Sequence, residues 1–280
     1  MAVDFNSKER SKRRKKAAVF KILISLFIIA GIGAGLYSAP RYPQINISQV
    51  DISGNETVSK ENIEQNIWQE LAGNKYFFFP NKNIFLYPKE KIENAVLALD
   101  PHLNTASVSF ADFQTISVNV TERKPSALWC GDIYQKDEIK PELENCFYLD
   151  KTGFIFAEAP GFSGNYYIRF YGLVSTSTSP IIGQSFVSQP NFKLLTFLTD
   201  KMKKDGFVIT RIVISEDNLV EAYLEGRGKL WLSSVQDLEK QINNFETLVN
   251  SEDFKGRDKD GNLKFNYIDL RFENKLFYKL

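Results

Sequence analysis

The pattern of apolar and polar positions separates one long uncharged stretch near the N-terminus from an amphipathic remainder. Residues 22–39 carry no charged side chain, and the apolar positions before them extend the stretch back to Ala17. This length exceeds the roughly 20 residues needed to cross the hydrocarbon core of a bilayer. Lys21 lies close enough to one end for its long side chain to reach the headgroups. The pattern therefore predicts a transmembrane helix over residues 17–39.

The charges on either side of this stretch predict its orientation. Residues 1–16 are rich in lysine and arginine, which outnumber Asp4 and Glu9, whereas Arg41 stands nearly alone beyond the other end. Because cytoplasmic flanks carry the excess of basic residues, the tail is expected in the cytoplasm and all that follows the helix outside it. A cleaved secretory signal is the alternative, since small residues end the stretch at Ala39. The stretch is longer than the roughly 7–15 residue core of such signals, so an uncleaved anchor is favoured.

Residues 45–122 show strand and helix patterns in the order strand, helix, helix, strand, strand. Alternation over residues 45–52 predicts the first strand, which ends at a Ser-Gly-Asn turn. Ser59 is placed to cap a first helix, and Pro88 suits the first turn of a second. Two further alternating runs between residues 106 and 120 predict a hairpin. Two helices can cover one face of such a three-stranded sheet, which predicts a small αβ domain.

Residues 123–280 are predicted to form a second, mainly antiparallel β domain with two helices. The helical spacing of apolar residues marks residues 192–202 and 235–249. The other apolar runs predict strands, with a hairpin turning at residues 150–153 and two strands in the tail 266–280. The whole chain is therefore predicted to be an α+β protein behind a single N-terminal transmembrane helix.

Composition and charge narrow the classes of function. The hydrophobic content of 43% is that of a globular chain, and the formal net charge of +1 averages the basic tail with a mildly acidic body. No basic stripe runs along the folded part of the sequence. Nucleic acid is therefore not expected as a partner.

Candidate catalytic and metal-binding residues are few. His102 is the single histidine, and its place in the turn after the second predicted helix favours a surface role. Residues 151–153 match the K-T-G element of penicillin-binding enzymes, but the chain has no S-x-x-K to supply an acylated serine. The loop carboxylates Glu142 and Glu144 have no neighbour that would tune them as an acid–base pair. We therefore expect no catalytic residue, no cofactor, no metal site and no small-molecule substrate.

The two cysteines, Cys130 and Cys146, end one predicted strand and begin the next. A hairpin would bring them together, and a disulfide persists outside the cytoplasm. Closing a loop of about 15 residues is worth roughly 3 kcal/mol in the chain-entropy model. Two free buried thiols are the alternative, and the disulfide is favoured.

Five short motifs, taken in order, resemble the FtsQ/DivIB family of bacterial division proteins. They are VDISGNETVSKENI at 50–63, Gly-Asn-Lys-Tyr at 73–76, ISVNVTERKPSALW at 116–129, FYLDKTGFIF at 147–156 and Tyr-Ile-Asp-Leu-Arg at 267–271. The resemblance implies that residues 45–122 are a POTRA domain. It also implies a non-enzymatic scaffold in the cytoplasmic membrane at the division septum. A membrane-anchored adaptor unrelated to division is the alternative.

The same resemblance implies where partners bind. In that family the second domain binds small single-pass proteins of the FtsB and FtsL type by adding a strand to the last edge of its sheet, which is β-augmentation. Carried over to this chain, residues 267–271 set the register, and the following strand is the exposed edge: Leu276, Phe277, Tyr278, Lys279 and Leu280. Residues 273–275 replace the usual glycine-containing turn, so the edge can differ in length or twist. Ordinary packing on the core is the alternative for Phe277 and Tyr278.

Overall fold

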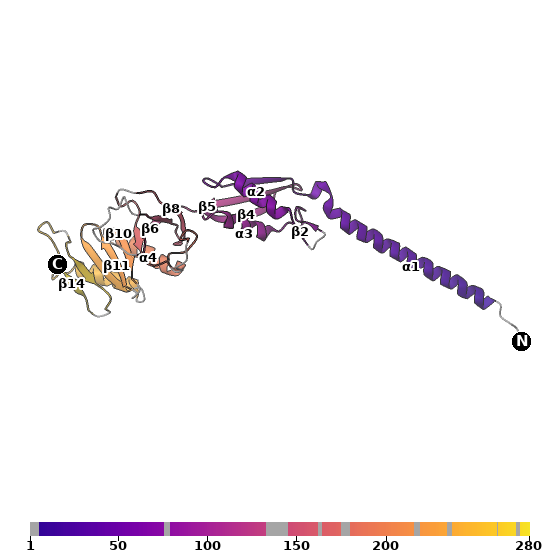
Figure 1. Ribbon diagram of the computed structural model, residues 1–280. Helices are drawn as coiled ribbons and strands as arrows, with labels where there is room; N and C mark the ends of the chain where they lie inside the picture. The colour runs from indigo at the N-terminus through magenta and orange to yellow at the C-terminus, as the bar shows by residue number, and fades with distance from the viewer. Residues whose placement is uncertain are drawn as a thin grey trace. The chain divides into compact units, whose positions relative to one another are not determined.

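The computed structural model describes most of the chain as two compact units, Met1–Glu122 and Arg123–Leu280 (Figure 1). The described residues are 6–75, 79–132, 145–161, 164–174, 180–215, 219–233, 237–261, 263–272 and 275–280. Six residues singled out in the sequence lie outside these ranges: Asp4, Tyr76, Glu142, Glu144, Glu273 and Asn274.

Helix α1 (Asn6–Ser38) contains the apolar stretch near the N-terminus. Its segment Arg13–Gly35 has a mean hydropathy of 2.3, and none of its residues is buried within the chain. Among the described residues, α1 is the one helix that is long and apolar enough to cross a membrane. Its exposed apolar side chains suit a lipid environment, which indicates a single-pass membrane protein.

Two 3₁₀ turns, η1 (Ala39–Arg41) and η2 (Pro43–Ile45), follow α1. The strand predicted over residues 45–52 is therefore wrong in its first half, and β1 begins only at Gln49. Pro43 lies in the first turn of η2, where its fixed φ suits a helical turn. Because proline has no backbone N–H to donate, Pro43 also disfavours extending β1 toward the N-terminus.

The sheet of the first unit has three strands in the order β1-β5-β4. They are β1 (Gln49–Ser53), β4 (Leu103–Phe110) and β5 (Thr115–Glu122). β4 and β5 form the predicted antiparallel hairpin, and β1 lies parallel to β5 with Gln49 opposite Thr115. A short ribbon between the helices was not predicted; it consists of β2 (Asn74–Lys75) and β3 (Phe79–Pro80).

Helices α2 (Lys60–Leu71) and α3 (Lys89–Leu99) pack against this sheet and share its hydrophobic core. The Ser59 hydroxyl oxygen accepts the N–H of Asn62 at 3.2 Å and caps α2 as the sequence predicts. The helices bury side chains that recur every four residues: Ile63, Ile67, Leu71, Ile92 and Val96. The predicted β-α-α-β-β arrangement is therefore confirmed.

The turn after β1 is held by the end of β5. Gly54 has a φ of +87°, and a Cβ there would lie 2.0 Å from the carbonyl oxygen of Val120, so only glycine fits. The Glu122 carboxylate accepts the backbone N–H groups of residues 56–58 at 2.7–2.9 Å. Burial raises the pKa of Glu122, but these hydrogen bonds outweigh burial and lower the pKa below its ordinary value. Glu122 thus ties the end of β5 to the turn that follows β1.

The second unit is built on a nine-stranded sheet in the order β14-β13-β12-β11-β10-β9-β6-β7-β8. Its strands are β6 (Ala127–Trp129), β7 (Phe147–Leu149), β8 (Ile155–Glu158), β9 (Arg169–Tyr171), β10 (Ile209–Ile214), β11 (Leu219–Leu224), β12 (Gly228–Ser233), β13 (Tyr267–Asp269) and β14 (Phe277–Lys279). β9 lies parallel to both β6 and β10, and β13 lies parallel to β12. The other pairs are antiparallel, so the predicted mainly antiparallel β domain is confirmed.

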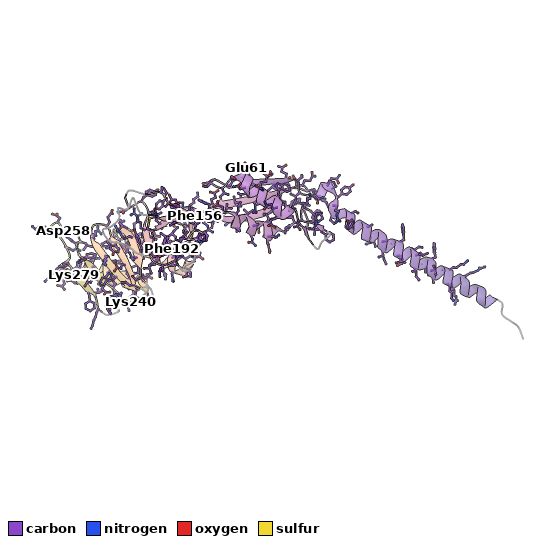
Figure 2. All side chains as sticks on the ribbon, viewed as in Figure 1. Glu61, Phe156, Phe192, Lys240, Asp258 and Lys279 are labelled. Carbon is purple, nitrogen blue, oxygen red and sulfur yellow. A yellow bond between two sulfur atoms is a disulfide. The ribbon has the colours of Figure 1, made fainter. Side chains whose placement is uncertain are left out.

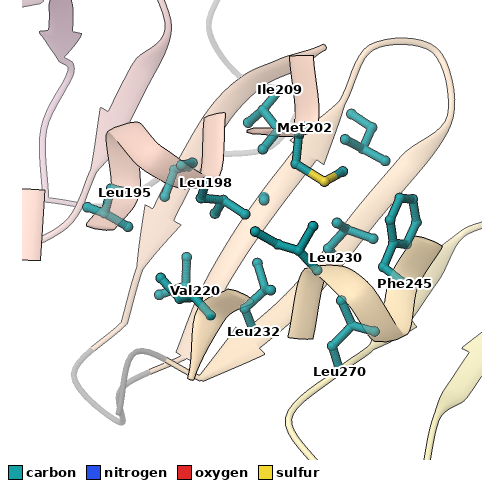
Figure 3. Packing of buried hydrophobic residues seen from close by; sticks show 14 of the residues in the cluster. Leu195, Leu198, Met202, Ile209, Val220, Leu230, Leu232, Phe245 and Leu270 are labelled. Carbon is teal, nitrogen blue, oxygen red and sulfur yellow. The ribbon is translucent and has the colours of Figure 1, made fainter. Parts of the chain in front are cut away.

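Helices α4 (Gln189–Lys204) and α5 (Leu238–Val249) bury their apolar faces in one hydrophobic cluster with the strands. Figure 3 shows Met202 of α4, Phe245 of α5 and Leu230 of β12 within this cluster. The sequence spacing of the apolar residues in both helices predicts this burial. This core fixes the strands that lead to the end of the sheet at β14.

The hairpin between β7 and β8 turns on Asp150 and Gly153. Asp150 Oδ1 accepts the N–H of Thr152 at 2.7 Å and the N–H of Phe154 at 3.1 Å. The same carboxylate pairs with Arg123. Burial raises the pKa of Asp150, but the hydrogen bonds from Thr152, Phe154 and Arg123 outweigh burial and lower the pKa. Residues 150–153, which read Asp-Lys-Thr-Gly, therefore form a structural turn.

Cys130 and Cys146 flank the β6–β7 pair. The antiparallel register places Trp129 opposite Phe147, so the two cysteines face each other one position further along. They are joined by a disulfide, with their Cα atoms 4.2 Å apart. That the bond forms in the native membrane protein stays a prediction, which is tested below.

Candidate functional site

The nine-stranded sheet ends in two edge strands, β8 and β14, which differ in how they are covered. Part of β8 is covered because the Gly183 N–H donates to the Ile155 carbonyl and the Ile155 N–H donates to the Gln184 carbonyl, each at 2.8 Å. Phe154 and Ser185 form a bridge beside these bonds. On the outer side of β14, no strand from the described part of the chain pairs. A strand from another protein can therefore add there.

The edge strand β14 is held to the domain through β13. Ile268 and Leu270 are buried in the core and fix the β13 segment in place. β14 then pairs with β13 in an antiparallel register: Tyr267 opposite Lys279, Ile268 opposite Tyr278 and Asp269 opposite Phe277. The position of every β14 side chain thus follows from the packing of β13.

Asp269 and Arg271 form an ion pair where the chain leaves β13. Arg271 Nε donates to Asp269 Oδ1 at 2.9 Å, and Arg271 Nη2 donates to Asp269 Oδ2 at 2.7 Å, which is a bidentate geometry. Asp269 is buried, and the Arg271 guanidinium lies 5.4 Å from the centroid of the Trp231 ring. The pair fixes the start of the connection to β14, so we assign it a positioning role.

The side chains of the β14 segment alternate between the two faces of the sheet. Leu276 packs against the core cluster, and the Tyr278 ring lies 5.2 Å from the ring of the buried Phe254. Phe277 lies on the opposite face, with its ring 5.4 Å from that of Phe272. Phe277 is 51% exposed and Tyr278 is 38% exposed. Tyr278 therefore contacts the core side, whereas Phe277 presents its ring to solvent.

The face of the sheet that carries Phe277 is aromatic and has charges of both signs, with Lys229 paired to Glu221 at 2.9 Å. The register of β12, β13 and β14 puts Lys229, Trp231, Tyr267, Asp269, Phe277 and Lys279 on this face. Trp231 and Tyr267 stack with ring centroids 4.3 Å apart. Lys229 Nζ lies 5.3 Å from the Trp231 ring centroid. Lys279 is exposed at the surface of the unit, as Figure 2 shows, and Leu280 is exposed beside it. On this face, a strand added beside β14 would thus meet the Phe277 ring and the Lys279 ammonium group.

Trp231 and Phe272 were not singled out in the sequence, although Trp231 carries a usable signal. Leu230 and Leu232 face the core, and because strand side chains alternate, Trp231 must face the other way. An outward tryptophan on the face that leads to a predicted edge strand is a candidate surface residue, and here β13 separates it from β14. Phe272 has no comparable signal because it follows β13 in a connection without regular alternation.

A cavity of about 560 Å³ opens elsewhere on the second unit. Its lining includes side chains of both charges, from Lys151, Asp200 and Lys203, together with Asn165. Its described lining contains no histidine or cysteine. The cavity therefore adds nothing to the candidate site at β14.

His102 lies in the turn between α3 and β4. Its ring Nδ1 is 2.8 Å from Asp100 Oδ1, and the same oxygen accepts the backbone N–H of His102 at 2.8 Å. The contact organises the turn locally. Within the described ranges, no three His, Cys, Asp or Glu side chains gather as a metal site.

Residues 45–123 match the protein family described as POTRA domain, FtsQ-type. The match runs from η2 through the end of β5 and so covers the whole sheet of the first unit. The family resemblance noted in the sequence is confirmed for this domain, and with α1 it is consistent with the FtsQ/DivIB family. No curated protein matches the chain.

Proposed function

We propose that this chain, which carries an FtsQ-type POTRA domain behind a single apolar helix, is a scaffold of the bacterial division machinery. Its second unit binds small single-pass proteins of the FtsB and FtsL type at β14. The observation that carries the proposal is the β14 edge, which no strand in the described ranges pairs on its outer side and whose three residues are all exposed. A scaffold of this kind performs no catalysis and takes no cofactor or small-molecule substrate.

Strand addition supplies both affinity and selectivity at such an edge. The outward N–H and C=O groups of β14 pair with the backbone of the incoming strand, which gives affinity without regard to its sequence. Selectivity comes from alternate side chains: Phe277 and Lys279 lie on one face, and Tyr278 and Leu280 lie on the other. Phe277 and Lys279 favour a partner strand that carries apolar and acidic residues at the positions beside them.

The proposed topology places the basic N-terminal tail in the cytoplasm and both folded units outside it, at the division septum. Support comes from the basic residues that precede the apolar part of α1, including Arg13 and Lys16. A disulfide between Cys130 and Cys146 also fits an extracytoplasmic compartment. Both statements are proposals that a topology assay with an external thiol or protease probe can check.

The binding site is tested with a soluble fragment covering residues 41–280 and the extracytoplasmic regions of FtsB- and FtsL-type proteins from the same organism. Phe277→Asp places a charge on the exposed face of β14, and we expect a roughly 30-fold loss of affinity, as for a central interface residue. Tyr166→Asp is the matched control, because Tyr166 is an exposed aromatic outside the β14 edge. Circular dichroism verifies that both variants fold.

Three outcomes distinguish the parts of this proposal. Loss of binding in Phe277→Asp, but not in Tyr166→Asp, supports both the scaffold role and the site. Binding that survives in Phe277→Asp and in a fragment ending at Arg271 keeps the scaffold role but refutes the β14 site. A folded fragment that binds neither partner contradicts the division role.

An adaptor anchored in the membrane but unrelated to division is the alternative function, since the family match covers residues 45–123 and not the second unit. Midcell localisation of a fluorescent fusion in dividing cells distinguishes the two functions. An even distribution around the cell membrane would favour the unrelated adaptor.

A further inference from the structure

Three exposed phenylalanines form a cluster at one end of the POTRA domain. Phe85, Phe110 and Phe113 are 66%, 53% and 58% exposed. Their rings contact in a chain, with centroids 6.2 Å apart for Phe85 and Phe113 and 5.9 Å apart for Phe110 and Phe113. A single exposed apolar side chain is ordinary on a protein surface, but a contiguous group marks a contact with a partner or a membrane. We call these three residues the phenylalanine cluster.

The cluster is drawn from two loops that are distant in sequence. Phe85 lies in the segment between β3 and α3, while Phe110 ends β4 and Phe113 lies in the turn to β5. Within that turn, Asp112 Oδ1 accepts the N–H of Gln114 at 2.8 Å, so this carboxylate is engaged by the backbone of its own turn. All three rings are exposed where these two segments meet.

Both loops are hydrogen-bonded to the chain just after the apolar helix. Asn83 Nδ2 donates to the Pro40 carbonyl at 2.9 Å, and Asn83 Oδ1 accepts the N–H of Phe85 at 3.0 Å. Gln114 Nε2 donates to the Pro43 carbonyl at 3.2 Å. The cluster is therefore tied from two sides to residues 40–43, two to five positions beyond the end of α1 at Ser38.

This tether sets the height of the cluster above the bilayer. The apolar segment of α1 ends at Gly35, so Pro40 falls in the headgroup layer, which is roughly 5–8 Å thick on each side. Phe85 is two residues from Asn83, a backbone distance of at most about 7 Å. A phenylalanine ring at that height reaches the boundary between headgroups and acyl chains. Tyr37 and Tyr42, both exposed, mark the same level on the connecting chain.

We propose that the phenylalanine cluster inserts into the outer interface of the membrane and docks the POTRA domain on the lipid surface. Lipid is the occupant because the chain that holds the cluster emerges from the bilayer at this point. Burying the three rings among headgroups and upper acyl chains removes apolar surface from water. The contact restricts motion of the POTRA domain about residues 40–48 and is independent of any division partner.

The test uses the full chain in phosphatidylcholine vesicles whose acyl chains carry bromine, a contact quencher of tryptophan emission. Phe113→Trp keeps an aromatic ring in the cluster. Asn104→Trp is the matched control, because Asn104 is exposed on β4 about 20 Å from Phe110. The three native tryptophans contribute equally to both variants and are subtracted with the unsubstituted chain.

We expect the added emission of Phe113→Trp to shift to shorter wavelength and to be quenched by brominated lipid. The emission of Asn104→Trp should stay at the wavelength of a hydrated indole and lose little intensity. Adding Phe85→Ser to Phe113→Trp should weaken the quenching, since it removes the neighbouring ring of the cluster. Phe110→Trp provides a second probe if circular dichroism shows that Phe113→Trp does not fold.

Equal quenching of the two probes, or no quenching of either, would overturn the proposal. A shift to shorter wavelength without bromine quenching would also overturn it, because it would identify a protein contact in place of lipid. None of these outcomes bears on partner binding at β14, so this inference and the proposed function fail independently.

Discussion

Glu122 connects the end of β5 to the turn after β1, and its replacement tests how the POTRA domain is held together. Its carboxylate accepts N–H groups from residues 56–58 at 2.7–2.9 Å. Glu122→Gln keeps the size and one acceptor oxygen but removes the charge. Glu56→Gln in the same turn is the matched control, since it makes the same chemical change on an exposed side chain and leaves the Glu56 N–H to donate to Glu122.

The expected loss follows from the number of hydrogen bonds and their charge. Hydrogen bonds to a charged group contribute about 1.5–3 kcal/mol, against about 1 kcal/mol for neutral pairs. Three N–H groups that lose a charged acceptor would thus lose about 3 kcal/mol, which partial exposure of the carboxylate reduces to about 2 kcal/mol. For a domain of this size, such a loss lowers the melting temperature by about 10 °C.

The pH dependence gives the same interaction a second signature. Because the pKa of Glu122 is lowered from its ordinary value of 4.5 in the folded state, its contribution is complete above that value. The contribution is lost as the pH falls through the folded-state pKa. Glu122→Gln carries no titrating group at this position, so its stability should fall less steeply with acid than that of the unsubstituted protein.

The assay is differential scanning calorimetry of residues 41–280, from neutral pH to below pH 4.5, with each variant compared with the unsubstituted fragment. Hydrogen–deuterium exchange of the segment around residues 56–58 assigns the transition to the POTRA domain. A Glu122→Gln melting temperature equal to that of Glu56→Gln would refute the reasoning. If the melting temperature of Glu122→Gln falls with decreasing pH as steeply as that of the unsubstituted fragment, the lowered pKa of Glu122 is refuted.

Two further predictions concern the second unit. Gly153→Ala should cost about 3 kcal/mol or more in urea unfolding, because the residue has a φ of +84° and a Cβ would lie 2.7 Å from the Phe192 ring. Gly164→Ala, at a φ of +86° with open space around it, should cost only about 1 kcal/mol, and equal losses would contradict the clash. Replacing both Cys130 and Cys146 by serine should lower the free energy of unfolding by roughly 3 kcal/mol. Alkylation of the unreduced native protein, followed by mass spectrometry, would contradict the disulfide by labelling both thiols.

The last two strands of the second unit could be predicted from the sequence because their apolar residues alternate. The tail 266–280 predicts two strands, and the structure places β13 and β14 there. The register alone decided that Tyr278 faces Phe254 while Phe277 faces solvent. Alternation says that neighbours face opposite ways, but which way depends on how β13 is buried beside β12.

In the first unit, local patterns likewise predict the helix but not the connection that precedes β1. The spacing of Ile63 and Ile67 and the cap at Ser59 determine α2 from sequence, since helix periodicity and capping act within a few residues. The strand expected from residue 45 onward was wrong, because hydrophobic alternation there competes with a proline-initiated 3₁₀ turn.

The sequence by itself determined the anchor, the order of the elements and the local faces of helices and strands. Only the tertiary structure decided that β8 is partly covered while no strand among the described residues pairs with the outer side of β14, and that Phe85 meets Phe113. These facts depend on segments far apart in the chain that meet through packing and hydrogen bonds. Periodicity carries no information on such meetings, because it records only which side of its own element a residue occupies.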